Sequence, residues 1–283
     1  MAAVALALAA ALSYGASDFV GGILSRTRSV WMVATASQLT AALATAIVAL
    51  LASGAAEPAD FGWAAGAGVG GAIGISSLYW GLSHGRMGVV APISGIGAAL
   101  VPVAVGLATG DQPSTLAWLG IAVAFPAIYL VPQADARHDP AIDAAAARSD
   151  GAGYGVIAGL GFGTLFALVG QIGDDAGFFP LALLQLTVAA TVVVIATLLR
   201  QPWVPRGRGL APVFAFGLLG SAALVFFQLA TQQGLLTIVS VIAALYPATT
   251  VAMAATFLGE TIGRLQSAGL ALAATAVVLV AVG

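Results

Sequence analysis

Charged residues are scarce in this sequence. Only 7% of its 283 residues are Asp, Glu, Lys or Arg, whereas a soluble domain contains about 25%. So few charges cannot cover the surface of a soluble fold, and we expect lipid to surround most of the protein. The 60% share of hydrophobic residues and the 36 glycines agree with this, because glycine is more frequent in membrane helices than in soluble ones.

Several function classes are excluded by missing residues. Nine arginines and no lysine give a net charge of −2, which provides no basic surface for nucleic acid. Without cysteine there is no disulfide, thiolate nucleophile or cysteine metal site, and His84 and His138 cannot form a metal centre alone. HExxH, GxSxG and P-loop motifs are also missing. We therefore expect no metal, no cofactor, no enzymatic activity and no ATP-driven pumping.

Long apolar runs divide the chain into ten segments. A run of about 20 apolar residues predicts a membrane-spanning helix, since every backbone group must be satisfied within its own segment. Strict alternation, which a barrel needs, does not occur. The first run also lacks the basic residues of a secretory signal. The predicted spans are Ala3–Leu24, Trp31–Ala52, Gly62–Leu82, Gly88–Ala108, Leu116–Val131, Gly153–Ile172, Phe179–Leu199, Ala211–Ala230, Leu236–Leu258 and Leu265–Val280.

Only the segment 133–150 between the fifth and sixth spans has a soluble composition. We therefore expect two domains, 1–132 with spans one to five and 151–283 with spans six to ten, joined by this polar connection.

The arginines sort by loop. All nine follow odd-numbered spans or lie in the central connection, while the opposite loops hold only acidic charges. By the positive-inside rule, the arginine-bearing loops are cytoplasmic. We therefore predict a multi-pass protein of a bacterial inner membrane with both termini outside, in the periplasm.

An internal repeat relates the two halves. At an offset of 149 residues, Gly110-Asp111 maps onto Gly259-Glu260 and Gly120 onto Gly269, while Tyr14-Gly15 is similar to Phe162-Gly163 with a shift of one residue. Because each half has five spans, the second enters the bilayer from the opposite face. The sequence thus predicts an all-α protein of ten transmembrane helices in an inverted five-plus-five repeat around a central cavity.

These features resemble a known family. Ten spans in two halves, with Tyr246-Pro247 in the ninth span and Leu258-Gly259-Glu260 closing it, are similar to the EamA-type, ten-helix members of the drug/metabolite transporter superfamily. The resemblance implies secondary transport by alternating access, most often export of an amino acid or another small metabolite, and aromatic amino-acid exporters are one subgroup. Family members often have both termini inside, unlike the orientation that the arginines indicate here.

The remaining alternative is a membrane-embedded enzyme or sensor without a recognisable catalytic motif. As partners we expect a small-molecule substrate and membrane lipid, with no nucleic acid, and we expect the protein to work as a monomer.

Asp18 is the ionisable residue that lies inside a predicted span. An intramembrane carboxylate costs about 2.5–3.5 kcal/mol on insertion scales, so it marks a candidate functional site. Asp18 is therefore a candidate for ion coupling. The alternative is a structural role, in which it holds a neighbouring helix, for example through Arg86.

Aromatic and polar side chains within the spans are the candidates for lining a substrate cavity, because rings provide contact area and hydroxyls or amides provide orientation. The predicted cavity residues are Tyr14, Ser17, Ser76, Tyr79, Trp80, Ser94, Phe162, Phe227, Gln228 and Tyr246. Each could instead pack or lie in an interfacial aromatic belt.

Prolines lie within two of the predicted spans. Pro92, Pro102 and Pro247 lie within spans four and nine, where proline removes a backbone donor and bends a helix. They are candidates for gating, with a static bend as the alternative.

Glycines spaced four apart in spans three and six, Gly66–Gly74 and Gly155–Gly163, predict closely packed helices.

Overall fold

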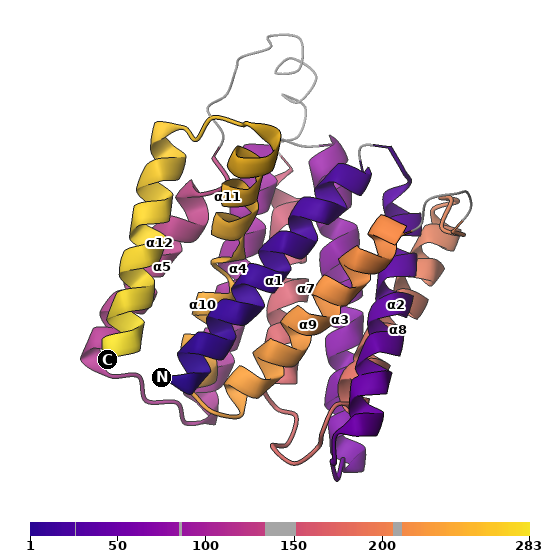
Figure 1. The fold of residues 1–283 in the computed structure, drawn as a ribbon, viewed down its shortest axis with the longest axis horizontal. Helices are drawn as coiled ribbons and strands as arrows, with labels where there is room; N and C mark the ends of the chain where they lie inside the picture. Colours follow the sequence, from indigo (N-terminus) through magenta and orange to yellow (C-terminus); the bar gives the residue numbers. More distant parts are fainter. Residues whose placement is uncertain (26, 85–86, 134–150, 206–210) are drawn as a thin grey trace.

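The structure is a computed structural model that describes residues 1–25, 27–84, 87–133, 151–205 and 211–283. The described residues form helices and connecting loops, with no β-strand among them (Figure 1). The helices are α1 Ala2–Ser25, α2 Val30–Leu51, α3 Pro58–His84, α4 Met87–Thr109, α5 Thr115–Leu130, α7 Ala152–Val169, α8 Phe179–Leu198, α9 Ala211–Thr231, α10 Leu236–Ala243, α11 Tyr246–Leu258 and α12 Arg264–Val282.

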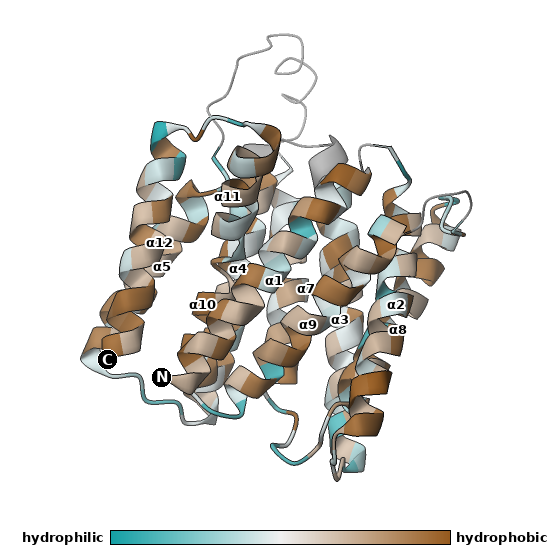
Figure 2. Ribbon diagram, viewed as in Figure 1, coloured by the Kyte–Doolittle hydropathy of each residue, from teal (hydrophilic) through white to brown (hydrophobic). Residues whose placement is uncertain are grey.

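The predicted division into ten spans is confirmed. Within the described residues, nine segments are long and apolar enough to cross a membrane, with α10 and α11 counted as one. The tenth, α5, has 16 residues, so it rises about 24 Å, and it packs along α12. Hydrophobic residues cover the flanks of the bundle (Figure 2). Large apolar side chains such as Leu43, Leu198 and Phe257 are exposed there, where lipid would solvate them.

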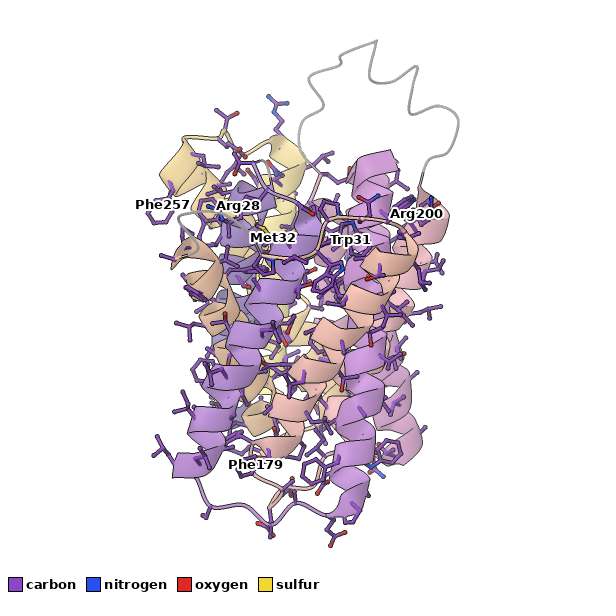
Figure 3. All side chains as sticks on the ribbon, turned by 90° about the vertical axis from the view of Figure 1, so that its right-hand side faces the viewer. Arg28, Trp31, Met32, Phe179, Arg200 and Phe257 are labelled. Carbon is purple, nitrogen blue, oxygen red and sulfur yellow. The ribbon has the colours of Figure 1, made fainter. Side chains whose placement is uncertain are left out.

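The two ends of the bundle differ in charge. Arg28 and Arg200 lie at one end and Phe179 at the other (Figure 3); we call the first the arginine end. The opposite, acidic end carries Asp60 in the first turn of α3, and Asp111, Asp174 and Asp175 in the loops that alternate with the arginine-bearing ones. Both chain termini also lie at the acidic end (Figure 1). The six arginines at 26, 86, 137, 148, 206 and 208 fall outside the described residues.

The two halves are related as an inverted repeat. Helix α1 starts at the acidic end, whereas its counterpart α7 ends there, so the halves run in opposite directions (Figure 1). The packing has the same symmetry: α1 lies along α9 as α7 lies along α3, and α7 contacts α4 as α1 contacts α10 and α11. Equivalent helices also pair directly, α2 with α8 and α5 with α12. Each half therefore supplies the same surfaces to the other.

Glycines allow the central helices to approach at backbone distance. A Cβ atom on Gly159 of α7 would lie 2.9 Å from the Cα of Gly97 on α4, and one on Gly161 would lie 2.7 Å from the carbonyl oxygen of Gly70 on α3. Real side chains do not fit at such distances. The predicted close packing along spans three and six is therefore present, with α7 inserted between α3 and α4.

The ninth span covers Leu236–Leu258 as predicted, and it is broken next to Pro247, the residue predicted to bend it. Helix α10 ends at Ala243 and α11 begins at Tyr246. Pro247 occupies the first turn of α11, where its ring and missing N–H are tolerated, whereas mid-helix it would clash with the carbonyl of Ala243. In contrast, α4 stays one helix through Pro92 and Pro102, supported by α7 along its length.

Candidate substrate cavity

A cavity of about 150 Å³ lies between the two halves. The first half contributes α1, α2, α3 and α4 to its wall, and the second contributes α7, α8, α9 and the first residue of α11. An apolar cavity of about this volume accommodates one benzene ring. Neither half encloses the cavity alone, so its shape depends on how the halves are arranged.

Six of the residues singled out from the sequence line this cavity: Tyr14, Ser17, Asp18, Tyr79, Phe162 and Tyr246. Pro247 is not a lining residue, but it follows Tyr246 in the first turn of α11. Five other predicted cavity residues, Ser76, Trp80, Ser94, Phe227 and Gln228, are not among the lining residues. Four of these five are buried, all except Trp80. The hydroxyls of Ser76 and Ser94 have no hydrogen-bond partner in the described part of the chain.

Tyr246 reaches the cavity because α1 and α11 touch through a glycine. A Cβ on Gly15 would overlap the carbonyl oxygen of Tyr246 and the side chain of Thr249. Thr250 donates a hydrogen bond from Oγ1 to the Gly15 carbonyl at 3.0 Å. Together with the break before Tyr246, this contact places the rings of Tyr14 and Tyr246 side by side, with centroids 6.4 Å apart.

Phe162 occupies the equivalent place in the second half. It precedes Gly163 as Tyr14 precedes Gly15. A Cβ on Gly163 would lie 2.7 Å from the carbonyl oxygen of Gly97 on α4, so α7 meets α4 as α1 meets α11. The repeat therefore places one aromatic ring on each of two opposed walls.

Further aromatic packing forms part of the cavity wall next to these rings. Phe166 lines the cavity and makes an edge-to-face contact with Tyr14 at 5.7 Å between centroids. It also packs against the fully buried Phe227 at 4.7 Å. Phe227 thus packs behind Phe166, on the side away from the cavity, and does not itself line the cavity.

A buried polar cluster that was not predicted from the sequence lies at the cavity wall. Gln185 of α8 lines the cavity and is 2% exposed. Its Nε2 donates to Thr45 Oγ1 at 3.0 Å, and Thr45 Oγ1 lies 2.7 Å from Ser221 Oγ. The side-chain oxygen of Gln185 has no partner among the described residues. The sequence signal that could have indicated this cluster is a single amide, Gln185, in the otherwise apolar span Phe179–Leu199.

Asp18 lies at the side of the cavity nearer the arginine end. It lines the cavity and its side chain is exposed, although it lies seven residues, or about 10 Å, inside the end of α1. Its neighbour Ser17 is buried and donates to the carbonyl of Phe216 at 3.4 Å. Arg86, the partner considered for Asp18, lies outside the described residues. An exposed carboxylate that lines the cavity therefore lies well inside α1, nearer its arginine end.

The acidic end is closed by hydrogen bonds between the halves. Asp60 is 6% exposed and accepts from the backbone N–H of Gly173 at 2.8 Å. Asp111 accepts from the backbone N–H of Thr237, in the first turn of α10, also at 2.8 Å. Ala55 N–H donates to the carbonyl of Asp175 at 2.7 Å. These bonds, which we call the acidic latch, join loops of one half to the other.

Gln228 also belongs to this end. Its Nε2 donates to the carbonyl of Gly177 at 3.0 Å, and Gly177 in turn is packed against Gly54, where a Cβ would lie 2.6 Å from the Gly177 Cα. The amide that the sequence suggested for substrate contact therefore fixes the loop between α7 and α8.

Two inverted halves that together line a cavity define a class of protein, the multi-pass membrane transporters for small solutes. The chain belongs to the EamA-like transporter family, whose model matches residues 1–132 and again residues 150–282. The predicted family resemblance is confirmed.

Solved structures share the fold, and 25 of their chains match. One, described only as the crystal structure of a protein, has a TM-score of 0.74 at 14% identity and covers 99% of this chain and 96% of its own. Among curated proteins no match was found.

Proposed function

We propose that this protein is a secondary transporter that exports a small organic metabolite by alternating access, with aromatic amino acids as the first candidates. The observation that carries the proposal is the cavity itself, which both halves line, with the exposed carboxylate of Asp18 toward the arginine end and hydrogen bonds between the halves at the acidic end. In this proposal the cavity opens toward the arginine end. Exchanging the conformations of two inverted halves would close that end and open the other. Aromatic rings in the cavity wall and a volume suited to one benzene ring support an aromatic solute.

Transport should depend on cavity tyrosines. We expect purified protein in liposomes to catalyse counterflow of labelled phenylalanine, tyrosine or tryptophan, and Tyr14→Ala to lower the rate by about tenfold or more through lost ring contacts. Tyr129→Ala is the matched control, since Tyr129 is exposed on α5 and should leave the rate unchanged. Counterflow absent for the whole panel, or equal in both variants, contradicts the proposal.

The same liposomes test ion coupling. We propose Asp18 as the proton carrier, because it is an intramembrane carboxylate whose exposed side chain lines the cavity. An imposed pH gradient should then alter net transport by the natural sequence but not by Asp18→Asn.

The orientation follows from the arginines. We propose that the arginine end faces the cytoplasm of a bacterial cell and that both termini lie outside, so the open cavity would load from the cytoplasm, as export requires. The working unit in this proposal is a monomer, since one chain contains the whole cavity lining.

Single cysteines can check this orientation, because the natural sequence has none. We expect a membrane-impermeant maleimide added to intact cells to label Asp174→Cys, at the acidic end, and to label Thr27→Cys, at the arginine end, only after the cells are lysed. Both positions are exposed, so the two variants control for each other. The reverse pattern would place the arginine end outside.

A further inference from the structure

Among the described residues that line the cavity, Asp18 is the one carboxylic acid, and there is no Arg, Lys or His. The chain as a whole has no lysine. A solute with a carboxylate therefore meets an acidic side chain in the cavity, and no described lining residue offers it a cation.

Three tyrosines line the same cavity as Asp18. Tyr14, Tyr79 and Tyr246 come from α1, α3 and α11, and the ring centroids of Tyr14 and Tyr246 lie 6.4 Å apart. The faces of aromatic rings attract cations, and the attraction grows where water is excluded. A carboxylate among aromatic rings is thus suited to an ammonium group.

An independent observation at the other end of the cavity also requires a donor. The side-chain oxygen of Gln185 is buried without a partner, while its Nε2 is held by Thr45. Gln185 lies six residues from the acidic end of α8, or about 9 Å, whereas Asp18 lies toward the arginine end. A buried acceptor left unpaired is costly, so a solute that donates a hydrogen bond would relieve it.

We propose that the recognised charge of the solute is its ammonium group, held by Asp18 among Tyr14, Tyr79 and Tyr246, and that the cavity takes protonated aromatic amines in preference to the amino acid or carboxylic acid of the same skeleton. This rests on the proposed transport of a small organic solute through this cavity, and it replaces the aromatic amino acids named there by the corresponding amines. In an amino acid the α-carboxylate adds a negative charge next to Asp18, which weakens rather than assists binding.

Three compounds of one skeleton test this: phenethylamine, a cation; phenylalanine, a zwitterion; and 3-phenylpropionate, an anion. Their affinities for the purified full-length protein can be measured by ligand-induced thermal stabilisation and by competition with counterflow. We expect phenethylamine to bind most tightly and 3-phenylpropionate most weakly. Asp18→Asn should weaken phenethylamine binding by about 10- to 100-fold, the usual effect of losing a charged hydrogen bond.

Two further variants separate charge from folding. Asp18→Glu keeps the carboxylate and should keep the preference for the amine, whereas Asp174→Asn removes an exposed carboxylate at the acidic end and should change nothing. Phenylalanine binding as tightly as phenethylamine, an unchanged ranking in Asp18→Asn, or binding of none of the three compounds would overturn the inference. If amino-acid counterflow persists in that case, the proposed function stands; if no solute is exchanged, both fail.

Discussion

Replacing Gly159 by leucine should prevent the protein from folding, and replacing it by alanine should lower the temperature of unfolding by several degrees. A Cβ at this position would lie 2.9 Å from the Cα of Gly97 and 3.0 Å from the carbonyl oxygen of Ser94. Both are backbone atoms of α4, so no side chain can rotate away. The helices would have to separate, and overpacking of this kind costs about 1–3 kcal/mol or more.

The measurement is the thermal unfolding midpoint of detergent-solubilised protein, followed by size-exclusion chromatography. Gly153→Leu is the matched control on the same helix, since a Cβ there meets no atom within 4 Å, and it should behave like the natural sequence. A Gly159→Leu protein as stable as Gly153→Leu would show that α7 and α4 do not touch as described.

The spans could be predicted because the bilayer fixes both their length and their composition. The prediction Trp31–Ala52 differs from α2 by one residue at each end, and Phe179–Leu199 differs from α8 by one residue. The inverted arrangement follows from the number of spans. Because five is odd, the second half starts on the opposite side of the membrane from the first. The break between α10 and α11 was harder to predict, because Pro92 and Pro102 show that a proline inside a membrane helix need not interrupt it.

The cavity was only partly predictable, because composition does not determine how each helix is rotated about its axis. Tyr79 lines the cavity, while Ser76, three residues earlier on α3, is buried outside the lining. Likewise Gln228 was predicted to line the cavity but donates to the carbonyl of Gly177 at the acidic end. Gln185 was not predicted to line the cavity but does so. Which amide faces the solute depends on contacts between helices from both halves.

The Tyr14 and Phe162 pair was predictable for a different reason. Each precedes a glycine at an equivalent position of the repeat, and close helix contact at that glycine fixes the rotation of the helix. Residues next to repeated close contacts are therefore placed more reliably than residues chosen for polarity alone.

Removing the acidic latch should open the end of the bundle that is closed in this structure. Asp111 accepts a hydrogen bond from Thr237 across the two halves, and a charged hydrogen bond contributes about 1.5–3 kcal/mol. Asp111→Ala should therefore raise the ratio of open to closed acidic ends by about 10- to 100-fold. Such a change shifts the balance between the two states that alternating access requires.

Ala176→Cys reports this opening. Ala176 is 3% exposed in the loop between α7 and α8, and the chain has no other cysteine, so the rate of alkylation in detergent measures exposure at the acidic end. Asp111 belongs to the α4–α5 loop and bonds to α10, so faster alkylation in Asp111→Ala reflects movement of the whole end rather than local loosening. Asp60→Ala should act similarly, although it also frees Gly173 in the labelled loop itself.

The control is Asp174→Ala, which removes an equal charge from the same end. The Asp174 side chain is exposed, and the bond that the residue makes with Gln232 uses its backbone carbonyl, so the latch stays intact and the alkylation rate should not change. If Asp111→Ala reacts no faster than Asp174→Ala, the inter-half hydrogen bonds do not hold the acidic end closed, and closure must then come from the apolar contacts around Phe166 and Phe227.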